Sequence, residues 1–259
     1  MNGIGTLPSS TDYTHNFDPE WYLDTYYASW DDGDFLNFIL KSFHEVFHTG
    51  ALHGKTLLDI GTEPSIHSII SASSYFDEIY LTDFAECNRN ILMDWKNGKR
   101  QNGIELCESV IVMEKNKFKQ TKEDRVREIR RKIKAVLPID ITKDTSLDIP
   151  APDIITSCLC LEAACATVDQ YRIAVKNIAS LLNSGKHLVV VGVLNQSFYR
   201  VGDFKFLCLS IDKKTLQKSF TENGFKIMFW REYFPPEQLE TDPEYSNFQT
   251  AFVLEVVKI

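Results

Sequence analysis

The sequence is informative first through what it lacks. No apolar run reaches the ~18 residues that a membrane-spanning helix needs. The first residues contain neither the basic stretch nor the apolar stretch of a secretory signal. Positive charge is also in deficit, since 28 Lys and Arg face 36 Asp and Glu and the formal net charge is -8. These absences argue against nucleic acid and anionic membranes as partners, and we expect a soluble, cytoplasmic protein.

The six cysteines lack the spacings that indicate a metal or redox site. None belongs to a C-x-x-C pair, and most lie in apolar runs, which favours reduced thiols in the core. Cys158 and Cys160 are two residues apart with no histidine nearby in the sequence, so we expect no metal site. Internal repeats and low-complexity segments are also missing.

One βαβ unit organises the chain. Residues 56–60 form an apolar run that ends at Gly61, which predicts a buried parallel strand and a tight turn. Residues 65–74 predict a helix, and residues 78–82 a second buried strand. Asp83 closes that strand about 20 residues after the glycine, an arrangement typical of doubly wound folds that bind nucleosides.

The ends of these two strands suit a nucleoside without phosphate. A glycine lets the backbone approach a ligand closely, and a carboxylate can accept hydrogen bonds from both ribose hydroxyls. The loop reads Gly-Thr-Glu-Pro-Ser from Gly61 and lacks the G-x-G-x-x-G pattern that cradles a pyrophosphate. This favours S-adenosylmethionine as the cofactor. On the loop alone, an ordinary structural turn is the alternative.

The remaining patterns predict alternating helices and strands. The predicted helices are residues 34–49, 86–99, 170–182 and 213–222. The predicted strands are residues 109–113, 136–141, 153–157, 187–194, 205–209, 225–230 and 248–257. Acids interrupt the basic segment over residues 115–134, so we expect a solvated helical face there rather than a nucleic-acid patch. This alternation indicates an α/β fold with a doubly wound sheet.

Several longer segments resemble one family. They are LLDIGTEPSI at residues 57–66, LTDFAECNR at 81–89, FDPEWYLDTYY at 17–27, VLPIDI at 136–141, SCLCLEAAC at 157–165 and SFYRVG at 197–202. In order and spacing they are similar to the nicotinamide, phenylethanolamine and indolethylamine N-methyltransferases, over nearly the whole chain. The resemblance implies the class I methyltransferase fold, with a mostly parallel, seven-stranded, Rossmann-like sheet and an antiparallel last strand. It implies one domain over residues 1–259, with an N-terminal helical lid and helices in residues 1–50 and the core in 55–259.

The same resemblance implies the cofactor residues, with S-adenosyl-L-methionine as donor and S-adenosyl-L-homocysteine as product. Tyr22 and Tyr27 of the lid would hydrogen-bond the methionyl end, and Asp83 would hold the ribose. The other implied cofactor residues are Gly61, Thr62, His67, Phe84, Asn88, Asp140, Ile141 and Cys158. Without the resemblance, the aromatic segment would be interpreted as an amphipathic helix packed on the body, and Asp83 as a helix cap.

Methyl transfer to an amine needs alignment and a proton acceptor. Glu162 stands where phenylethanolamine-type members have a glutamate and is the predicted acceptor, although a surface acid is the alternative. Tyr199 is predicted to line the catalytic pocket and Leu159 to form a wall. Gly192 and Cys208 replace an aspartate and a serine of nicotinamide-type members, which disfavours nicotinamide.

Glu63 is the main departure from the family pattern, which has a second glycine there. A negative side chain close to the cofactor carboxylate would weaken binding unless it turned outward. The leading hypothesis is N-methylation of a small aromatic or alkyl amine by a monomer. Two alternatives remain: a non-catalytic or regulatory relative with a degraded cofactor loop, and a methyltransferase that acts on a thioether.

Overall fold

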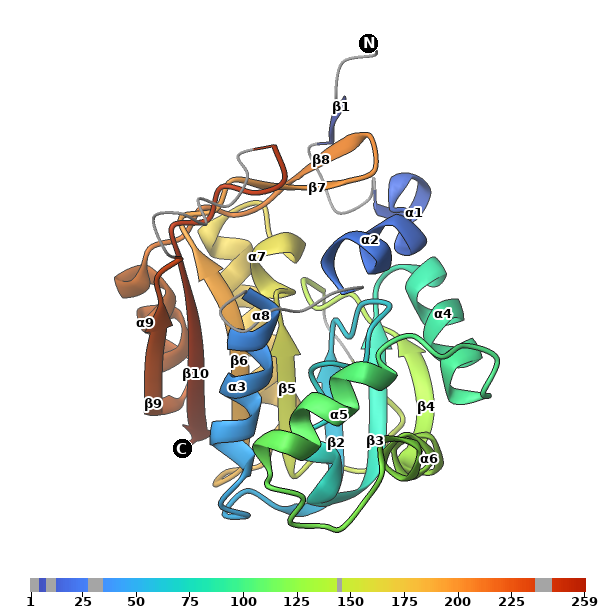
Figure 1. The fold of residues 1–259 in the computed structure, drawn as a ribbon. Coiled ribbons are helices and arrows are strands. Elements are labelled where there is room, and N and C mark those ends of the chain that lie inside the picture. The colour runs from blue at the N-terminus through green and yellow to red at the C-terminus, as the bar shows by residue number, and fades with distance from the viewer. Residues whose placement is uncertain (1–4, 8–12, 28–34, 144–145, 236–243) are drawn as a thin grey trace.

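A seven-stranded sheet forms the centre of the protein (Figure 1). The computed structural model describes residues 5–7, 13–27, 35–143, 146–235 and 244–259. The strand order is β4-β3-β2-β5-β6-β10-β9. In chain order these strands are β2 (Gly54–Ile60), β3 (Phe76–Asp83), β4 (Ile133–Pro138), β5 (Ile154–Cys158), β6 (His187–Leu194), β9 (Phe225–Tyr233) and β10 (Thr250–Lys258).

The direction of the strands fits the predicted doubly wound sheet. β4, β3, β2, β5 and β6 pair in parallel, whereas β10 pairs antiparallel with both β6 and β9. From β2 the chain winds outward to β3 and β4 and then returns to build β5 and β6 on the other side. Sequence order therefore reverses beside β2. Open α/β sheets bind ligands outside the carboxyl ends of their strands at such a reversal.

Helices cover both faces of the sheet because alternate strand residues point to opposite faces. Leu57 packs in the core cluster on one face, and its neighbour Leu58 in the cluster on the other. The first face carries α3 (Phe35–Phe47), α4 (Glu86–Lys96), α5 (Ile104–Met113) and α6 (Lys122–Lys132). The second carries α8 (Val168–Leu181) and α9 (Lys213–Glu222). In Figure 1, α3 and α5 lie in front of the sheet.

A smaller sheet and two short helices lie over one end of the main sheet (Figure 1). Its order is β1-β8-β7, with β1 (Gly5–Leu7) parallel to β8 (Phe204–Leu207) and β7 (Phe198–Val201) antiparallel to β8. The helices are α1 (Tyr13–Asn16) and α2 (Pro19–Tyr26). The sequence patterns missed β1, β7 and α1, which are too short to show a period.

The lid helix α2 begins at Pro19. The Asp18 side chain caps it, because its Oδ1 accepts hydrogen bonds from the backbone N–H groups of Glu20 and Trp21 at 3.1 and 3.0 Å. Pro19 occupies the first turn, where its missing N–H costs nothing. The cap fixes where the helix begins, and thereby where Tyr22 lies.

The predicted helix over residues 65–74 is wrong. The segment forms a succession of turns that ends in one 3-10 turn, η2 (Ala72–Ser74). Three of its isoleucines enter the core: Ile66, Ile69 and Ile70. The hydroxyl of Ser68 donates to Asp59 Oδ2 at 3.0 Å. β-branched and hydroxyl side chains both disfavour a helix, so the segment follows the contacts of the core instead.

The predicted strand over residues 109–113 is also wrong, since these residues end helix α5. When a short apolar run is rich in β-branched residues, its periodicity alone does not distinguish a buried strand from a segment of a buried helix. In the structure Val110 and Ile111 are buried, whereas Val112 is 70% exposed. That spacing of burial is helical.

The basic segment is helical over α6, but its face is not fully solvated as predicted. Arg125 is fully buried and its Nη2 lies 2.6 Å from Glu114 Oε2. Lys132 is buried as well. These two basic residues attach α6 to the body together with Arg130, whose Nε donates to the Trp95 carbonyl oxygen at 2.8 Å, whereas Arg127 and Arg131 face solvent.

The other predicted helices and strands are confirmed with small shifts at their ends, although Asp34 lies outside the described residues. The predicted strand over residues 136–141 begins earlier, as β4, so Asp140 follows the strand. Within the described part of the chain, no helix combines the length and apolar character needed to cross a membrane.

Candidate active site

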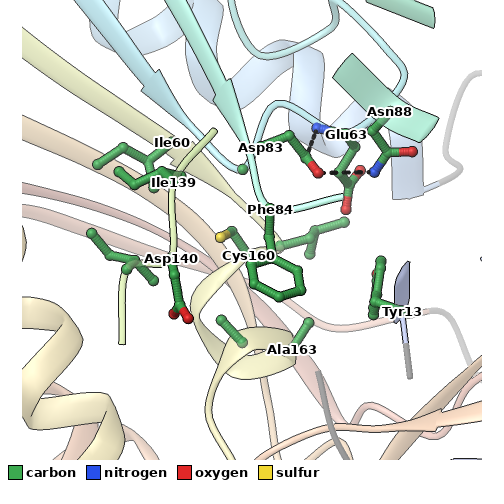
Figure 2. A pocket seen from close by; sticks show the side chains of 14 residues that line it. Tyr13, Ile60, Glu63, Asp83, Phe84, Asn88, Ile139, Asp140, Cys160 and Ala163 are labelled. Carbon is green, nitrogen blue, oxygen red and sulfur yellow. Dashed lines mark hydrogen bonds between the residues drawn. The ribbon is translucent and has the colours of Figure 1, made fainter. Parts of the chain in front are cut away.

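A cavity lies at the carboxyl ends of β2, β3, β4 and β5 (Figure 2), and we call it the first cavity. Six of the predicted cofactor residues line it: Gly61, Asp83, Phe84, Asn88, Asp140 and Ile141. They belong to three segments of the chain, which lie at the carboxyl ends of the parallel strands β2, β3 and β4. The sheet therefore brings these residues together at one edge.

Asp83 is held at one side of the first cavity by three donors. Its Oδ2 accepts the backbone N–H of Glu63 at 2.8 Å. Its Oδ1 accepts the backbone N–H of Ala85 at 2.8 Å and Asn88 Nδ2 at 3.2 Å. Burial raises the pKa of this carboxyl. The helix-cap alternative is wrong, because the N-cap residue of α4 is Ala85.

Asp140 lies across the first cavity from Asp83, and the ring of Phe84 lies in the space that these residues border (Figure 2). Thr142 Oγ1 donates to Asp140 Oδ1 at 2.6 Å, and Lys143 Nζ lies 2.8 Å from Asp140 Oδ2. Although burial opposes the shift, these hydrogen bonds lower the pKa of Asp140. Phe84 is 38% exposed, so part of its ring is free to stack on a planar ligand.

Position 61 requires glycine for two reasons. Its φ is +70°, in the left-handed region, and a Cβ there would lie 2.3 Å from Cys160 Sγ. The backbone N–H groups of Gly61 and Thr62 both donate to the Thr82 carbonyl oxygen at 2.9 Å. The loop after β2 is therefore held tightly against β3.

The side chain of Glu63 turns inward, and its exposed fraction is 9%. Its Oε2 accepts the Tyr22 hydroxyl at 2.8 Å and the Tyr27 hydroxyl at 3.1 Å. Its φ of +59° is uncommon for a residue with a side chain. Burial raises the pKa of Glu63 to about 8, although the tyrosine hydrogen bonds oppose this shift. The loop position that the family gives to glycine thus holds a buried carboxyl here.

A second cavity of about 560 Å³ adjoins the first, within the range of small-ligand sites. Glu63, Leu159 and Ala163 line both cavities. Four further predicted residues line the second cavity: Tyr22, Tyr27, Tyr199 and Cys208. The predicted lid tyrosines therefore face the second cavity.

Aromatic side chains dominate the described lining of the second cavity. Besides the predicted tyrosines it includes Tyr26, Phe35, Tyr245 and Phe248. Among the described lining residues Glu63 alone carries a carboxyl group, and none is Lys, Arg or His. A neutral amide, Gln196, donates through Nε2 to Ser246 Oγ at 2.7 Å.

Tyr199 joins the walls of the two cavities. Its hydroxyl is hydrogen-bonded to that of Tyr13, which lines the first cavity. Its ring stacks on Phe206 with centroids 5.7 Å apart. The position of Tyr199 thus depends on both α1 and β8.

Five predicted site residues line neither cavity: Thr62, His67, Cys158, Glu162 and Gly192. His67 is buried, with Nε2 3.4 Å from Cys158 Sγ and its ring 4.9 Å from that of Tyr27. Burial lowers the pKa of His67 to about 3, so the ring is neutral near pH 7. In this structure His67 supports Tyr27, and a cofactor contact stays a prediction.

Glu162 is deeply buried, so the alternative of a surface acid is wrong. It is 1% exposed, and neither carboxyl oxygen has a hydrogen-bond partner among the described residues. Burial raises its pKa to about 8. A Cβ at Gly192 would lie 2.6 Å from Glu162 Oε1 and 2.7 Å from the Phe252 ring, which explains the glycine. The catalytic role of Glu162 stays a prediction.

The sequence patterns missed several lining residues. Tyr13 precedes the predicted lid, but its stacking on Phe17 at 4.6 Å reflects a four-residue aromatic spacing visible in the sequence. The wall at residues 245–248 depends on a long-range contact, in which the Arg200 N–H donates to the Tyr245 carbonyl oxygen at 2.8 Å. No local pattern predicts that pairing.

Known proteins with similar sequences cover nearly the whole chain. The model of the NNMT/PNMT/TEMT family matches residues 6–243. Indolethylamine N-methyltransferase of Oryctolagus cuniculus is 31% identical over 256 residues, which cover 95% of this chain and 93% of the relative. Phenylethanolamine N-methyltransferase of Homo sapiens is 31% identical over 239 residues, covering 87% and 83%. Nicotinamide N-methyltransferase of Homo sapiens is 30% identical over 228 residues, covering 85% and 86%.

Solved structures with low sequence identity share the fold. A SAM-dependent methyltransferase from Methanosarcina mazei aligns with a TM-score of 0.56 at 15% identity, over 83% of this chain and 97% of that one. The N-methyltransferase NodS from Bradyrhizobium japonicum, in complex with S-adenosyl-L-homocysteine, aligns with a TM-score of 0.53 at 12% identity, over 96% of both chains.

Proposed function

Because the chain belongs to the NNMT/PNMT/TEMT family, we propose that it transfers the methyl group of S-adenosylmethionine to the nitrogen of a small amine. The relatives named above are N-methyltransferases of indolethylamine, phenylethanolamine and nicotinamide. The observation that supports the proposal in this chain is the pair of adjoining cavities. A donor in the first and an acceptor in the second would meet where Glu63, Leu159 and Ala163 line both.

The first cavity suits the nucleoside of the donor. Asp83 would accept the ribose hydroxyls, with Asn88 beside it, and a buried carboxylate makes strong hydrogen bonds of this kind. Phe84 would stack on the adenine, whose edge Asp140 and Ile141 would contact. When bound, S-adenosylmethionine supplies an electrophilic methyl group, and the residues of this chain hold and align it.

The second cavity suits a small aromatic or alkyl amine. Its aromatic walls favour an apolar ligand body. Nicotinamide is disfavoured, because the glycine at position 192 has no room for an aspartate beside Glu162. Cys208 offers only a weak donor. Most of the rate would come from holding the amine nitrogen, methyl and sulfur in line, a contribution of up to about 7–11 kcal/mol.

Calorimetric titration with S-adenosylmethionine and S-adenosylhomocysteine, followed by a screen of amines with a labelled methyl donor, tests the proposal. We expect micromolar binding of both nucleosides, and methylation of aromatic or alkyl amines in preference to nicotinamide. If neither nucleoside binds, the degraded-loop relative is the better interpretation.

A thioether acceptor is the second candidate. Apart from Glu63, the described lining of the second cavity carries no acid or base, and a neutral thioether would fit such walls. Including thioethers in the same screen separates the two, since methylation of thioethers without amines would replace the proposed function.

A further inference from the structure

We infer that Glu63 is the carboxylate that faces the amine and takes up its proton during methyl transfer. The inference deepens the proposed function and rests on it. Family resemblance points to Glu162 for this role, so the inference depends on where the two carboxyls lie in this chain.

Glu63 lies where the two cavities meet. Of the residues that line both, Leu159 and Ala163 are apolar, and Glu63 is the acid. The described lining of the second cavity contains no other carboxyl group and no basic residue. An ammonium ion that entered this cavity would therefore find its complementary charge at Glu63.

The two lid tyrosines hold the carboxyl of Glu63 and leave one oxygen available. Both hydroxyls, of Tyr22 and Tyr27, donate to Oε2. No described residue donates to Oε1. The tyrosines thus fix the orientation of the carboxyl, while Oε1 can accept a proton from a ligand.

Glu162 lacks such access. It lines neither cavity, is 1% exposed, and lies beside Gly192, where an added Cβ would come within 2.6 Å of its Oε1. To reach an amine it would need a chain of water molecules through packed side chains. Direct contact favours Glu63.

The proton balance of the reaction requires such an acceptor. The N–CH3 bond forms as the S–CH3 bond breaks, the bonding electrons stay on sulfur, and a neutral thioether results. Only a neutral amine has the lone pair that attacks, so the ammonium ion gives one N–H proton to Oε1 of Glu63 before the N–CH3 bond forms, and Glu63 keeps that proton until the methylated ammonium ion leaves. The carboxylate becomes a neutral carboxyl, which suits its buried position.

The surroundings of Glu63 set its titration. The titratable groups that interact with it are Tyr13, Tyr22, Tyr26, Tyr27, Asp59, Asp83, Cys158, Cys160 and Tyr199. These neighbours are acids, phenols and thiols, and none of them supplies a positive charge. An ammonium ion in the cavity would supply one, and it would therefore favour the charged form of Glu63. Its pKa of about 8 is close to the pH at which a general base works best.

Two substitutions at Glu63 test the role. Glu63→Gln keeps the shape and removes the proton acceptor, and Glu63→Gly removes the side chain at a φ that glycine adopts freely. We expect both variants to bind S-adenosylmethionine at least as tightly as the wild type. Turnover on amines should fall on the order of 10²-fold, and the limb of the pH–rate profile that reports Glu63 should disappear.

Two controls accompany these variants. Glu86→Gln removes one exposed acid near the site and should leave all constants unchanged. Glu162→Gln should lower turnover less than Glu63→Gln does. As a readout without catalysis, calorimetry of an amine against the S-adenosylhomocysteine-loaded protein should show weaker binding of the ammonium form to Glu63→Gln.

Three results would overturn the inference. One is higher turnover in Glu63→Gly, which would mark Glu63 as a burden on the cofactor loop. Another is a changed S-adenosylmethionine affinity in Glu63→Gln with normal turnover, which would mean that the Glu63 carboxyl contacts the methionyl end of the cofactor and not the amine. The third is a larger loss in Glu162→Gln. If the wild type binds the donor but methylates no amine, the proposed function fails together with the inference, and this is visible before any variant is made.

Discussion

Asp83 and Glu63 are joined through the backbone of the cofactor loop. The N–H of Glu63 donates to Asp83 Oδ2, so the carboxylate that would hold the ribose also fixes the residue beside the transfer point. The positive φ of Glu63 costs conformational free energy, of the order of 1 kcal/mol, and this hydrogen bond helps to hold it. A change at Asp83 therefore affects both cavities.

Asp83→Ala should weaken S-adenosylmethionine binding by about 10- to 100-fold. The physical reason is the loss of a charge-assisted acceptor worth about 1.5–3 kcal/mol. Titration calorimetry gives the dissociation constant, and thermal unfolding verifies that the variant is folded. Asp77→Ala is the matched control, because Asp77 is an exposed acid near the other end of the same strand. Equal affinity in Asp83→Ala and the wild type would remove Asp83 from the site.

The sequence predicts which residues stand at the ends of strands better than it predicts how deeply their side chains are buried. The apolar run before Gly61 and the spacing to Asp83 placed both residues correctly at the first cavity. The burial of Glu162 was not predictable, because it depends on the missing side chain of Gly192 on a strand that follows 30 residues later. Nor could the sequence show that Glu63 turns inward, since its partners Tyr22 and Tyr27 come from the lid.

At the scale of elements, α2 connects the lid to the cofactor loop. Tyr22 and Tyr27, from α2 and the residue after it, both donate to Glu63 Oε2. Arg100 reaches Glu20 at the start of α2 with a shortest N–O distance of 2.5 Å. The helix has only eight residues, and such short helices are marginal without tertiary contacts and caps.

Asp18→Ala should loosen the lid and weaken cofactor binding. Loss of an N-cap side chain costs about 1 kcal/mol of helix stability. We expect faster hydrogen exchange over Pro19–Tyr26 and an affinity for S-adenosylmethionine that is lower by about fivefold, measured by calorimetry. Asp212→Ala is the control, because Asp212 caps α9 in the same way, accepting the Thr215 N–H at 2.9 Å. Equal effects of the two variants on affinity would show that α2 plays no special part.

The elements that the sequence mispredicted lie in the core rather than at its edge. Residues 109–113 are apolar and rich in β-branched side chains, whereas residues 65–74 combine three isoleucines with five serines. In both segments the hydrophobic period is obscured, because tertiary contacts rather than one exposed face determine the backbone conformation. By contrast, β6 and α9 have the bounds that the sequence predicts, because a continuous apolar run and a capped amphipathic pattern are local signals.

At the scale of the whole molecule, buried carboxyls gather near the reversal of the sheet. Burial raises the pKa of Asp59 to about 6 and those of Glu63 and Glu162 to about 8, and it also raises that of Asp83. A folded state that holds protons more tightly than the unfolded chain loses stability as the pH rises. The burial of these carboxyls therefore costs folding free energy, and this cost increases toward alkaline pH. A positively charged ligand would reduce it.

The free energy of unfolding should therefore fall between about pH 5 and about pH 8.5, and Glu162→Gln should reduce that fall. For Glu162 the ordinary pKa is 4.5 and the folded value is about 8, so its contribution is fully present below pH 4.5. It declines as the pH rises toward about 8 and is constant above, because the carboxyl is then charged in both states. Since one pKa unit corresponds to about 1.4 kcal/mol, the decline amounts to a few kcal/mol at most. Urea unfolding of the wild type and the variant across this range measures it.

Glu108→Gln is the control, because hydrogen bonding to Lys122 lowers the pKa of that exposed acid and its loss should leave the fall intact. A fall of the same size in Glu162→Gln would mean that Glu162 is charged in the folded protein, and a water-linked path from the second cavity to its carboxylate would then become the better account of its role.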